Sequence, residues 1–404
     1  MKKPITVVGI PARNEETTVS EVALAADAGL SRFFPDGKNV VILAENGSTD
    51  ETVKAFESTN LESHKKVVST DGNTGKGTNV FAIIEKALEW DADRVLLLDA
   101  DVRSVKPSWV DSLASAVEDQ ENPIMGVPVY QRNRFEANTT NHLASPLLAA
   151  TLGRYIQQPI GGEFAFNRAF MERVNKWHRP ASAQFYGVDI WLTANALREN
   201  AQVFDVPLGR KIHTPPFAKV LRMPQQVLDA LFHVVLTTGE PRGLDLPFAN
   251  KNGVDDGVGV RPSDDLVMQA TNAVERYIDT HWAELAEVFP SAKQCTAVSW
   301  GLKITTKQWP YVLADALTAL ASGAQLQIVR DHLISLYVQR IFSWWEEISD
   351  LDNIQTGELV IQQAQATALE VQRRRLTWPS SGISDAFHVG NWEGYGIRAS
   401  KEGA

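Results

Sequence analysis

The stretch of residues 95–101 places the strongest constraint on the fold. It reads Val-Leu-Leu-Leu-Asp-Ala-Asp, so an apolar run stops at two carboxylates that lie two positions apart. Such a run is typical of a strand buried on both faces. Because side chains of a strand alternate in direction, Asp99 and Asp101 are predicted to point to the same side. Carboxylates at the carboxyl edge of an α/β sheet suit a divalent cation and its phosphate ligand, although an isolated Asp-x-Asp is commonly only a polar strand end.

The first half of the chain alternates predicted strands and helices. Apolar segments typical of strands cover residues 5–10, 40–44, 67–68 and 95–98. The first three are followed by predicted helices at about 17–28 (starting at Thr17 or Thr18), from about 49 (capped by Ser48) and at about 78–89. This alternation predicts a parallel sheet with helices on both faces. Because the strand ends then gather on one edge, the four polar loops are predicted to line one crevice.

The loop at Gly75-Lys76-Gly77 is the second feature with chemical meaning. It is not a Walker motif, and no Gly-x-Gly-x-x-Gly follows the first strand, so neither P-loop nor dinucleotide binding is supported. Alone it would be a turn with a solvated lysine. Together with Asp99-Ala100-Asp101 on the next strand, it favours binding of a phosphate-linked sugar.

Composition limits the partners and the compartment. With 404 residues the chain is long enough for two domains, and 49 acidic against 39 basic side chains give a net charge of −10. This balance argues against nucleic acid or anionic lipid as partners. The single cysteine, Cys295, excludes a disulfide framework and fits a reducing compartment. We find no signal peptide and no apolar run of roughly 18 residues, so we expect a cytoplasmic protein without a membrane span.

Four motifs, in order and spacing, resemble the nucleotide-sugar-binding half of GT-A glycosyltransferases. They are Pro11-Ala12-Arg13-Asn14-Glu15-Glu16, Glu45-Asn46-Gly47-Ser48-Thr49-Asp50, Gly75-Lys76-Gly77 and Asp99-Ala100-Asp101. Many relatives have Asp where this chain has Glu45, but the longer carboxylate can still accept from a base N–H or a ribose hydroxyl. The resemblance implies that the donor is bound by Pro11, Ala12, Asn14, Glu15, Glu45, Gly75, Lys76, Asp99 and Ala100.

A second block narrows the resemblance. Residues 155–163, then Gly187-Val188-Asp189 and Lys211-Ile212-His213, look like the mannosylglycerate synthase and glucosyl-3-phosphoglycerate synthase group of retaining enzymes. The implied fold is GT-A, a Rossmann-like nucleotide-sugar-binding mixed sheet flanked by helices, with a mostly α-helical C-terminal region. The implied donor is GDP-mannose, GDP-glucose or UDP-glucose, and the acceptor is D-glycerate or 3-phosphoglycerate. The implied cofactor is Mn²⁺ or Mg²⁺.

Within this resemblance, Gly161, Glu163 and Asp189 belong to the catalytic region. Gly161 and Gly162 lack a Cβ, so their backbone can approach a sugar closely. Glu163 is expected to bind sugar hydroxyls, and so is Asp189, for which capping of a helix N-terminus is the alternative. The metal is assigned to Asp101 and His213, with Asp99 as a further ligand, since neutral imidazole suits an oxygen-rich manganese site.

The segment of residues 130–141 carries the predicted acceptor site. Its two arginines, Arg132 and Arg134, precede Thr139 and Thr140 at a predicted helix start. A guanidinium offers a bidentate fork to a small anion, and helix-terminal N–H groups add donors. The resemblance implies Arg134 with Thr139 or Thr140, and Arg132 as the second choice. Exposed arginines that form salt bridges on a loop are the alternative.

After about residue 220 the pattern becomes helical. Apolar residues recur at three- and four-residue spacing over residues 225–237, 264–285, 311–321 and 327–348, and strand-like runs disappear. We therefore predict a catalytic domain over 1–220 and a helical domain over 221–404 that completes the acceptor site and forms a homodimer. The Gly- and Asp-rich residues 241–262 are interpreted as a lid or a connection. Trp309 and the Trp344-Trp345 pair are expected in a core or a subunit interface.

Three other functions remain open at this point. A sugar-nucleotide nucleotidyltransferase would share the sheet and the carboxylates, but would be expected to have a basic Gly-rich loop in place of residues 11–16. A noncatalytic nucleotide-sugar sensor would bind the donor without turnover. Another GT-A glycosyltransferase would use a sugar or lipid acceptor, and an inverting one would need Asp189 as its base.

Overall fold

The computed structural model describes residues 3–212, 221–243 and 264–378. These residues form two compact units. The first contains residues 3–131 and 158–212, and the second contains residues 132–157 and the described residues after 220. The segment that carries Arg134 and Thr139 therefore packs with the second unit, although it lies within the N-terminal half of the sequence.

The first unit is built on a seven-stranded sheet of order β3-β2-β1-β4-β6-β5-β7. Its strands are β1 (Ile5–Ala12), β2 (Lys38–Glu45), β3 (His64–Ser69), β4 (Arg94–Leu97), β5 (Ile124–Gln131), β6 (Ala165–Asn167) and β7 (Gln202–Arg210). Strand β6 runs antiparallel to β4 and to β5, whereas the other pairings are parallel. The purely parallel sheet expected from the alternation of elements is therefore wrong, and the mixed sheet implied by the resemblance is confirmed.

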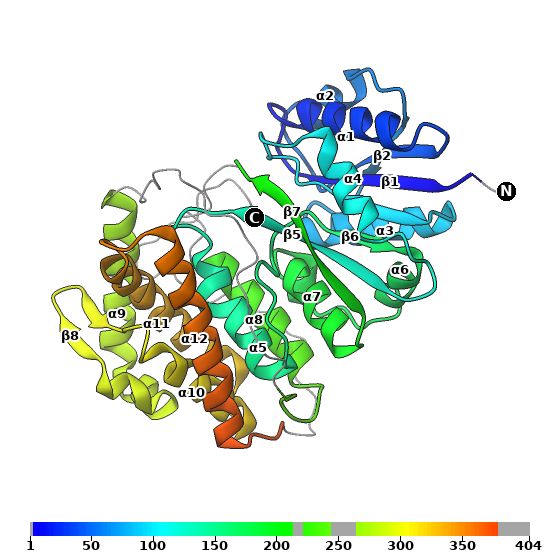
Figure 1. Ribbon diagram of the computed structural model, residues 1–404. Helices are drawn as coiled ribbons and strands as arrows, with labels where there is room; N and C mark the ends of the chain where they lie inside the picture. Colours follow the sequence, from blue (N-terminus) through cyan, green and yellow to red (C-terminus); the bar gives the residue numbers. More distant parts are fainter. Residues whose placement is uncertain (1–2, 213–220, 244–263, 379–404) are drawn as a thin grey trace. The chain divides into compact units, whose positions relative to one another are not determined.

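Helices cover both faces of this sheet. They are α1 (Val19–Phe33), α2 (Thr52–Ser58), α3 (Lys76–Glu89), α4 (Pro107–Ser115), α6 (Arg168–Val174), the short 3-10 helix η2 (Ala181–Gln184) and α7 (Val188–Arg198). One core joins α1, α2 and α4 to alternate residues of β1 and β2, including Val8 and Val41. Helix α3 packs on the opposite face (Figure 1). A Cβ at Gly9 would lie 2.4 Å from Ile83 of this helix. Close helix–sheet contact explains why glycine occupies this strand position.

The ends of several elements differ from the sequence prediction. Helix α2 begins at Thr52, because Ser48 does not cap it: its hydroxyl accepts the Asn14 N–H, and its own N–H donates to Glu45. Helix α1 begins at Val19, and α3 already begins at Lys76. Strand β4 ends at Leu97, and residues 100–101 form a turn. Asp99 and Asp101 therefore lie beyond the strand, so strand alternation does not set the direction of their side chains.

The second unit is mainly helical. It contains the π-helix η1 (Thr140–Ala144), α5 (Ser145–Leu152), α8 (Arg222–Val235), α9 (Asp264–Val288), the 3-10 helix η4 (Pro290–Gln294), α10 (Trp309–Ala321), α11 (Leu326–Glu347) and α12 (Asn353–Arg374). The four predicted helices correspond to α8, α9, α10 and α11. Two features were missed: α12, which begins with a capping box of Asp352 and Gln355, and the hairpin of β8 (Thr296–Val298) and β9 (Gly301–Lys303). None of the helices within the described ranges is both long and apolar enough to cross a membrane.

Tryptophans and a buried arginine hold the second unit together. Trp309 and Trp344 are fully buried, and the Trp309 indole N–H donates to the His142 carbonyl at 2.7 Å. The expectation of a core position for these residues is therefore confirmed.

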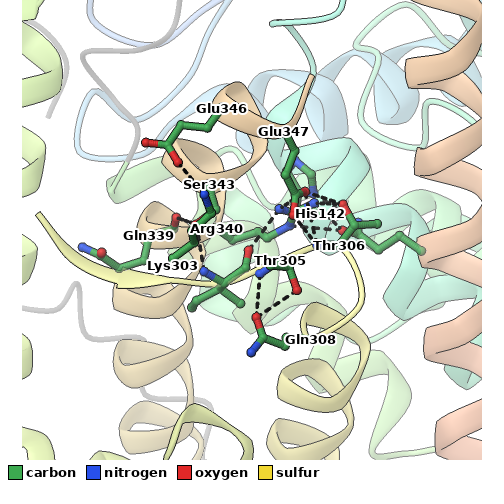
Figure 2. A network of polar contacts seen from close by, with 12 residues as sticks. His142, Lys303, Thr305, Thr306, Gln308, Gln339, Arg340, Ser343, Glu346 and Glu347 are labelled. Atoms are coloured by element: carbon green, nitrogen blue, oxygen red, sulfur yellow. Dashed lines mark hydrogen bonds and ion pairs between the residues drawn. The ribbon is translucent and has the colours of Figure 1, made fainter. Parts of the chain in front are cut away.

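Arg340 lies at the centre of the polar network in Figure 2, where it donates to Glu347 (2.9 Å), Thr306 (2.6 Å) and the Ile304 carbonyl (3.0 Å). It also donates to Gln363 at 3.2 Å, so the network links α11 to α12. Burial lowers the pKa of Arg340 to about 10, against the effect of Glu347, and the side chain stays charged at neutral pH.

Candidate functional site

Hydrogen bonds join the loops that follow the first three strands. Asn79 of α3 donates to the Ala12 carbonyl at 3.2 Å and to the Asn46 side chain at 2.8 Å. Asn46 in turn donates to the Thr74 carbonyl at 2.6 Å. These buried amides hold the ends of β1 and β2 against the loop before α3. The predicted gathering of polar loops at the carboxyl edge of the sheet is confirmed.

The residues assigned to the nucleoside lie at this edge. Pro11 and Ala12 end β1, and Glu45 ends β2 with one carboxylate oxygen accepting the Ser48 N–H at 2.9 Å. Asn14 has a left-handed backbone (φ 57°), and its side chain accepts the Thr49 N–H at 2.8 Å. The Glu15 N–H donates to the Thr52 hydroxyl at 2.7 Å. The two loops after β1 and β2 are thus fixed to each other, as a rigid nucleoside site requires.

The centre of the site is a group of three carboxylates and two ammonium groups, which we call the lysine–carboxylate cluster: Asp99, Glu163, Asp189, Lys76 and Lys211. Lys76, the first residue of α3, lies 2.7 Å from Asp99 and 3.2 Å from Asp189. Lys211, which follows β7, lies 3.0 Å from the other oxygen of Asp99 and 2.8 Å from Glu163. The five side chains therefore alternate in charge from Asp189 to Glu163.

The charges of the cluster shift its pKa values. Burial by itself would raise the pKa of Asp99, but Lys211 and Lys76 outweigh burial and hold this pKa well below its usual range. Burial raises the pKa of Asp189, and Lys76 only partly opposes it. One oxygen of Asp189 is buried and makes no hydrogen bond within the described residues. Asp189 lies in the first turn of α7 without capping it, so this oxygen is placed to accept from a ligand hydroxyl.

The residues present fit a divalent cation. With all groups ionised, four carboxylates (Asp99, Asp101, Glu163 and Asp189) face two lysines, which leaves two negative charges in excess. Burial and the neighbouring Asp99 raise the pKa of Asp101, and its carboxylate forms no ion pair within the described residues. The Asp99 oxygens are already held by lysines, so Asp101 is the better ligand. Among the residues that the structure describes, no group of three or more His, Cys, Asp or Glu side chains could hold a metal by itself, and His213 lies outside these residues.

Glu163 was expected to bind sugar hydroxyls, but protein groups donate hydrogen bonds to both of its carboxylate oxygens. It is fully buried, Tyr130 donates its hydroxyl to one oxygen, and Lys211 donates to both oxygens, at 2.9 and 2.8 Å. The Asp99 N–H adds a contact of 3.3 Å. Because these donors engage both oxygens, we reinterpret Glu163 as a support of Lys211 instead of a sugar ligand.

The glycines before Glu163 permit a close approach of backbone to the cluster. Gly162 has φ 95°, and a Cβ there would lie 2.2 Å from the nearer Asp99 oxygen. A Cβ at Gly161 would lie 2.4 Å from the Pro128 ring. Gly75 and Gly77 likewise pack against residues 183–185, where a Cβ at Gly77 would lie 1.8 Å from the Ala183 carbonyl. Glycine is needed at these positions because a Cβ would clash with neighbouring atoms, whether or not the backbone forms a turn.

Gly162→Ala is expected to lower kcat by about 100-fold, because displacing a reacting centre by about 1 Å has that effect. Both Gly162 and Gly209 have positive φ, but a Cβ at Gly209 would meet nothing within 4 Å. Gly209→Ala is therefore the matched control: it should cost about 1–2 kcal/mol of stability through backbone strain while kcat stays within about threefold. Steady-state kinetics of both variants test this, and equal kcat values would refute the contact.

The residues assigned to the acceptor belong to the second unit. Arg134 donates to the Leu351 carbonyl, and its guanidinium lies 5.1 Å from the centre of the Phe135 ring. Thr139 is buried with its hydroxyl 3.0 Å from that of Tyr337, and Thr140 begins η1. Arg132 is half-buried in the same segment. Within the described residues, Arg134 forms no hydrogen bond with Thr139 or Thr140, so their joint role stays a prediction.

Two residues of the site had no role in the sequence interpretation. Tyr130 is the last apolar residue of β5, and Lys211 is part of the motif Lys211-Ile212-His213, in which only His213 has a predicted role. A lysine at the end of a strand gives no local signal of burial. Its importance appears only when a partner 112 positions away, Asp99, is placed beside it.

Comparison with known proteins supports the chemistry of the first unit. Residues 7–177, less than half of the chain, match the model of glycosyl transferase family 2, and this region is therefore a glycosyltransferase domain. No curated protein sequence matches the chain significantly.

Solved structures of glucosyl-3-phosphoglycerate synthase from Mycobacterium tuberculosis are similar to the chain. The complex with Mn²⁺, UDP and phosphoglyceric acid has 26% identity and a TM-score of 0.48, and the match covers 58% of this chain and 78% of that chain. The complex with Mn²⁺, UDP-glucose and glycerol 3-phosphate has 24% identity and a TM-score of 0.46, with 58% and 80% covered.

Proposed function

We propose that this protein is a retaining, metal-dependent glycosyltransferase that moves a hexose from a nucleoside diphosphate sugar to D-glycerate or 3-phosphoglycerate in the cytosol. The observation that carries the proposal is the lysine–carboxylate cluster at the carboxyl edge of the sheet. Three of its members, Lys76, Asp99 and Glu163, lie inside the region that matches glycosyl transferase family 2. The excess of carboxylates at this edge suits a divalent cation, which would in turn bind the diphosphate of the donor. The motifs that resemble glycerate-type enzymes support the acceptor class.

Each part of the cluster has a task in this reaction. A divalent cation held by Asp101 and Asp99, with His213 as the expected further ligand, would neutralise charge on the leaving diphosphate. Lys76 fixes Asp99 relative to Asp189, whose free oxygen accepts from a sugar hydroxyl. Glu45, which ends β2, would bind the nucleoside. The chain's own residues would therefore bind and orient the donor.

A panel assay tests the proposal. Wild-type protein is incubated with UDP-glucose, GDP-glucose or GDP-mannose and Mn²⁺ or Mg²⁺, and each donor is paired with D-glycerate, 3-phosphoglycerate, glycerol or a free sugar. Mass spectrometry should detect a hexosylglycerate or its phosphate. Products from neutral acceptors alone would overturn the glycerate assignment, and donor binding without turnover would indicate a sensor.

Arg134 should govern acceptor use. A charge-assisted arginine contact contributes about 1.5–3 kcal/mol, so Arg134→Ala should lower kcat/KM for the acceptor by roughly 10- to 150-fold and leave the donor Kd nearly unchanged. Arg134→Lys should recover only part of this loss, since an ammonium lacks the planar fork. Arg373→Ala, at an exposed position of α12, is the control. Parent-like acceptor kinetics of both Arg134 variants would show that the acceptor anion binds elsewhere.

A further inference from the structure

Lys211 stands out because it joins four neighbouring strands. Its ammonium contacts Asp99 after β4, Gly161 and Glu163 before β6 and, through Glu163, Tyr130 in β5, while Lys211 itself follows β7. These strands are adjacent in the sheet order β4-β6-β5-β7. One buried ammonium thus connects residues in or next to four adjacent strands of the sheet.

The acceptors around the Lys211 ammonium match its number of N–H donors. A lysine ammonium has three N–H donors, and three acceptor groups surround Lys211: Asp99 at 3.0 Å, the Gly161 carbonyl at 2.9 Å and the Glu163 carboxylate at 2.8 Å. Only 5% of the Lys211 side chain is exposed, and none of Glu163. Two of these acceptors, Asp99 and Gly161, are at the donor site. The third, Glu163, also accepts a hydrogen bond from the Tyr130 hydroxyl.

We propose that Lys211 is a positioning residue of the donor site, and that its ammonium fixes the Asp99 carboxylate relative to the Gly161–Gly162 backbone. Glu163 and Tyr130 anchor the ammonium and do not touch the substrate. The close passage of Gly162 supports this role, because a Cβ there would lie 2.2 Å from Asp99 and 3.2 Å from the Lys211 ammonium. The inference rests on the proposed glycosyl transfer and adds a residue that acts through its neighbours.

A purely structural role would make the same contacts, so the test must separate folding from positioning. Lys211→Met leaves the buried Glu163 carboxylate without its counter-ion, which should lower the midpoint of urea unfolding. Adding Glu163→Gln removes that carboxylate charge. The double variant Lys211→Met with Glu163→Gln should therefore regain much of the lost stability. In this variant Asp99 and the Gly161 carbonyl still lack the hydrogen bonds from the Lys211 ammonium.

The expected result is a separation of stability from turnover. The double variant should have kcat lowered by about 100-fold while the Kd for the nucleoside diphosphate changes by less than about threefold, because the loops after β1 and β2 are untouched. Glu163→Gln alone should lower kcat by less than about 10-fold, since Lys211 keeps Asp99 and Gly161. Lys66→Met, at an exposed position of β3, is the control and should keep parental kcat.

Each outcome decides the question. Recovery of kcat together with stability in the double variant would show that Lys211 serves folding only, and would overturn the inference. If the double variant does not fold, Lys211→Arg is measured in its place. A planar guanidinium cannot donate to three acceptors arranged around a single atom, so kcat of Lys211→Arg should fall by about 10-fold or more. A parental kcat in this variant would contradict the proposal. A wild-type protein that transfers no hexose would overturn the proposed function itself. Active wild-type protein with equally active Lys211 variants would overturn this inference alone.

Discussion

Asp101→Ala is expected to lower kcat/KM by about 1,000-fold and to abolish metal-dependent binding of the donor. A bound cation supplies several kcal/mol of stabilisation to the leaving diphosphate, and about 4 kcal/mol corresponds to this factor. Asp101 is the carboxylate of the site that forms no ion pair within the described residues, whereas Lys76 and Lys211 hold both oxygens of Asp99. Removing Asp101 therefore removes the side chain best placed to hold the cation.

The measurement is calorimetry of the nucleoside diphosphate sugar with and without Mn²⁺, alongside steady-state kinetics. Asp36→Ala is the matched control, because Asp36 is an exposed carboxylate in the turn before β2, and this variant should behave as the parent. The fold of Asp101→Ala should be retained, since the residue is half-buried in a turn at the sheet edge. Unchanged metal-dependent affinity in Asp101→Ala would remove Asp101 from the metal site.

Arg340→Met is expected to destabilise the second unit by about 3 kcal/mol. Removing one partner of a buried ion pair leaves the other unpaired, which costs roughly 3–5 kcal/mol, and the lower value applies because 21% of the Glu347 side chain is exposed. The substitution also leaves the Ile304 carbonyl, Thr306 and Gln363 without the arginine donor. Urea unfolding followed by tryptophan fluorescence reports on both units, because Trp309 and Trp344 are buried in the second and Trp109 and Trp191 in the first. Arg340→Met should shift the part of the transition that belongs to the second unit.

The same region supplies the control for Arg340. Lys303 and Glu346 form an ion pair of 3.0 Å beside the Arg340 network, but 40% and 49% of their side chains are exposed (Figure 2). Surface pairs contribute about 0–1 kcal/mol, so Lys303→Met should change stability by less than about 1 kcal/mol. Equal destabilisation by the two variants would mean that burial of Arg340 does not set the strength of this network.

Local patterns were enough to predict the elements around the donor loops. The segments that became β1, β2 and β4 are mostly apolar, and those of β1 and β2 are rich in β-branched residues. The gathering of their loops follows from parallel strands alone. Helices α8 to α11 show clear three- and four-residue spacing in the sequence. In contrast, β6 has only three residues, Ala165–Asn167, which is too short for a periodic signal. Its antiparallel direction depends on its neighbours.

Long-range pairing explains what the sequence could not show at the site. The resemblance singled out Lys76, Asp99, Gly161, Glu163 and Asp189, and the structure brings all of them to one place.

Their connection through Lys211 depends on four strands, β4, β5, β6 and β7, that are separated in the sequence. No spacing rule predicts that Tyr130 and Lys211 occupy both oxygens of Glu163. Likewise, Thr139 contacts Tyr337, which is 198 positions away.

Phosphorus NMR of a single reaction tests the central claim most directly, because it identifies the leaving group. Wild-type protein is mixed with a nucleoside diphosphate hexose, D-glycerate or 3-phosphoglycerate, and Mg²⁺, and spectra are recorded over time. A glycosyltransferase must release a nucleoside diphosphate in amounts equal to the hexosylglycerate formed, and only when the acceptor is present. A parallel sample receives inorganic pyrophosphate as a nucleotidyl acceptor. Release of hexose 1-phosphate and a nucleoside triphosphate there, without hexosylglycerate in either sample, would reveal nucleotidyl transfer and would contradict the assignment of the lysine–carboxylate cluster as the donor site of a glycosyltransferase.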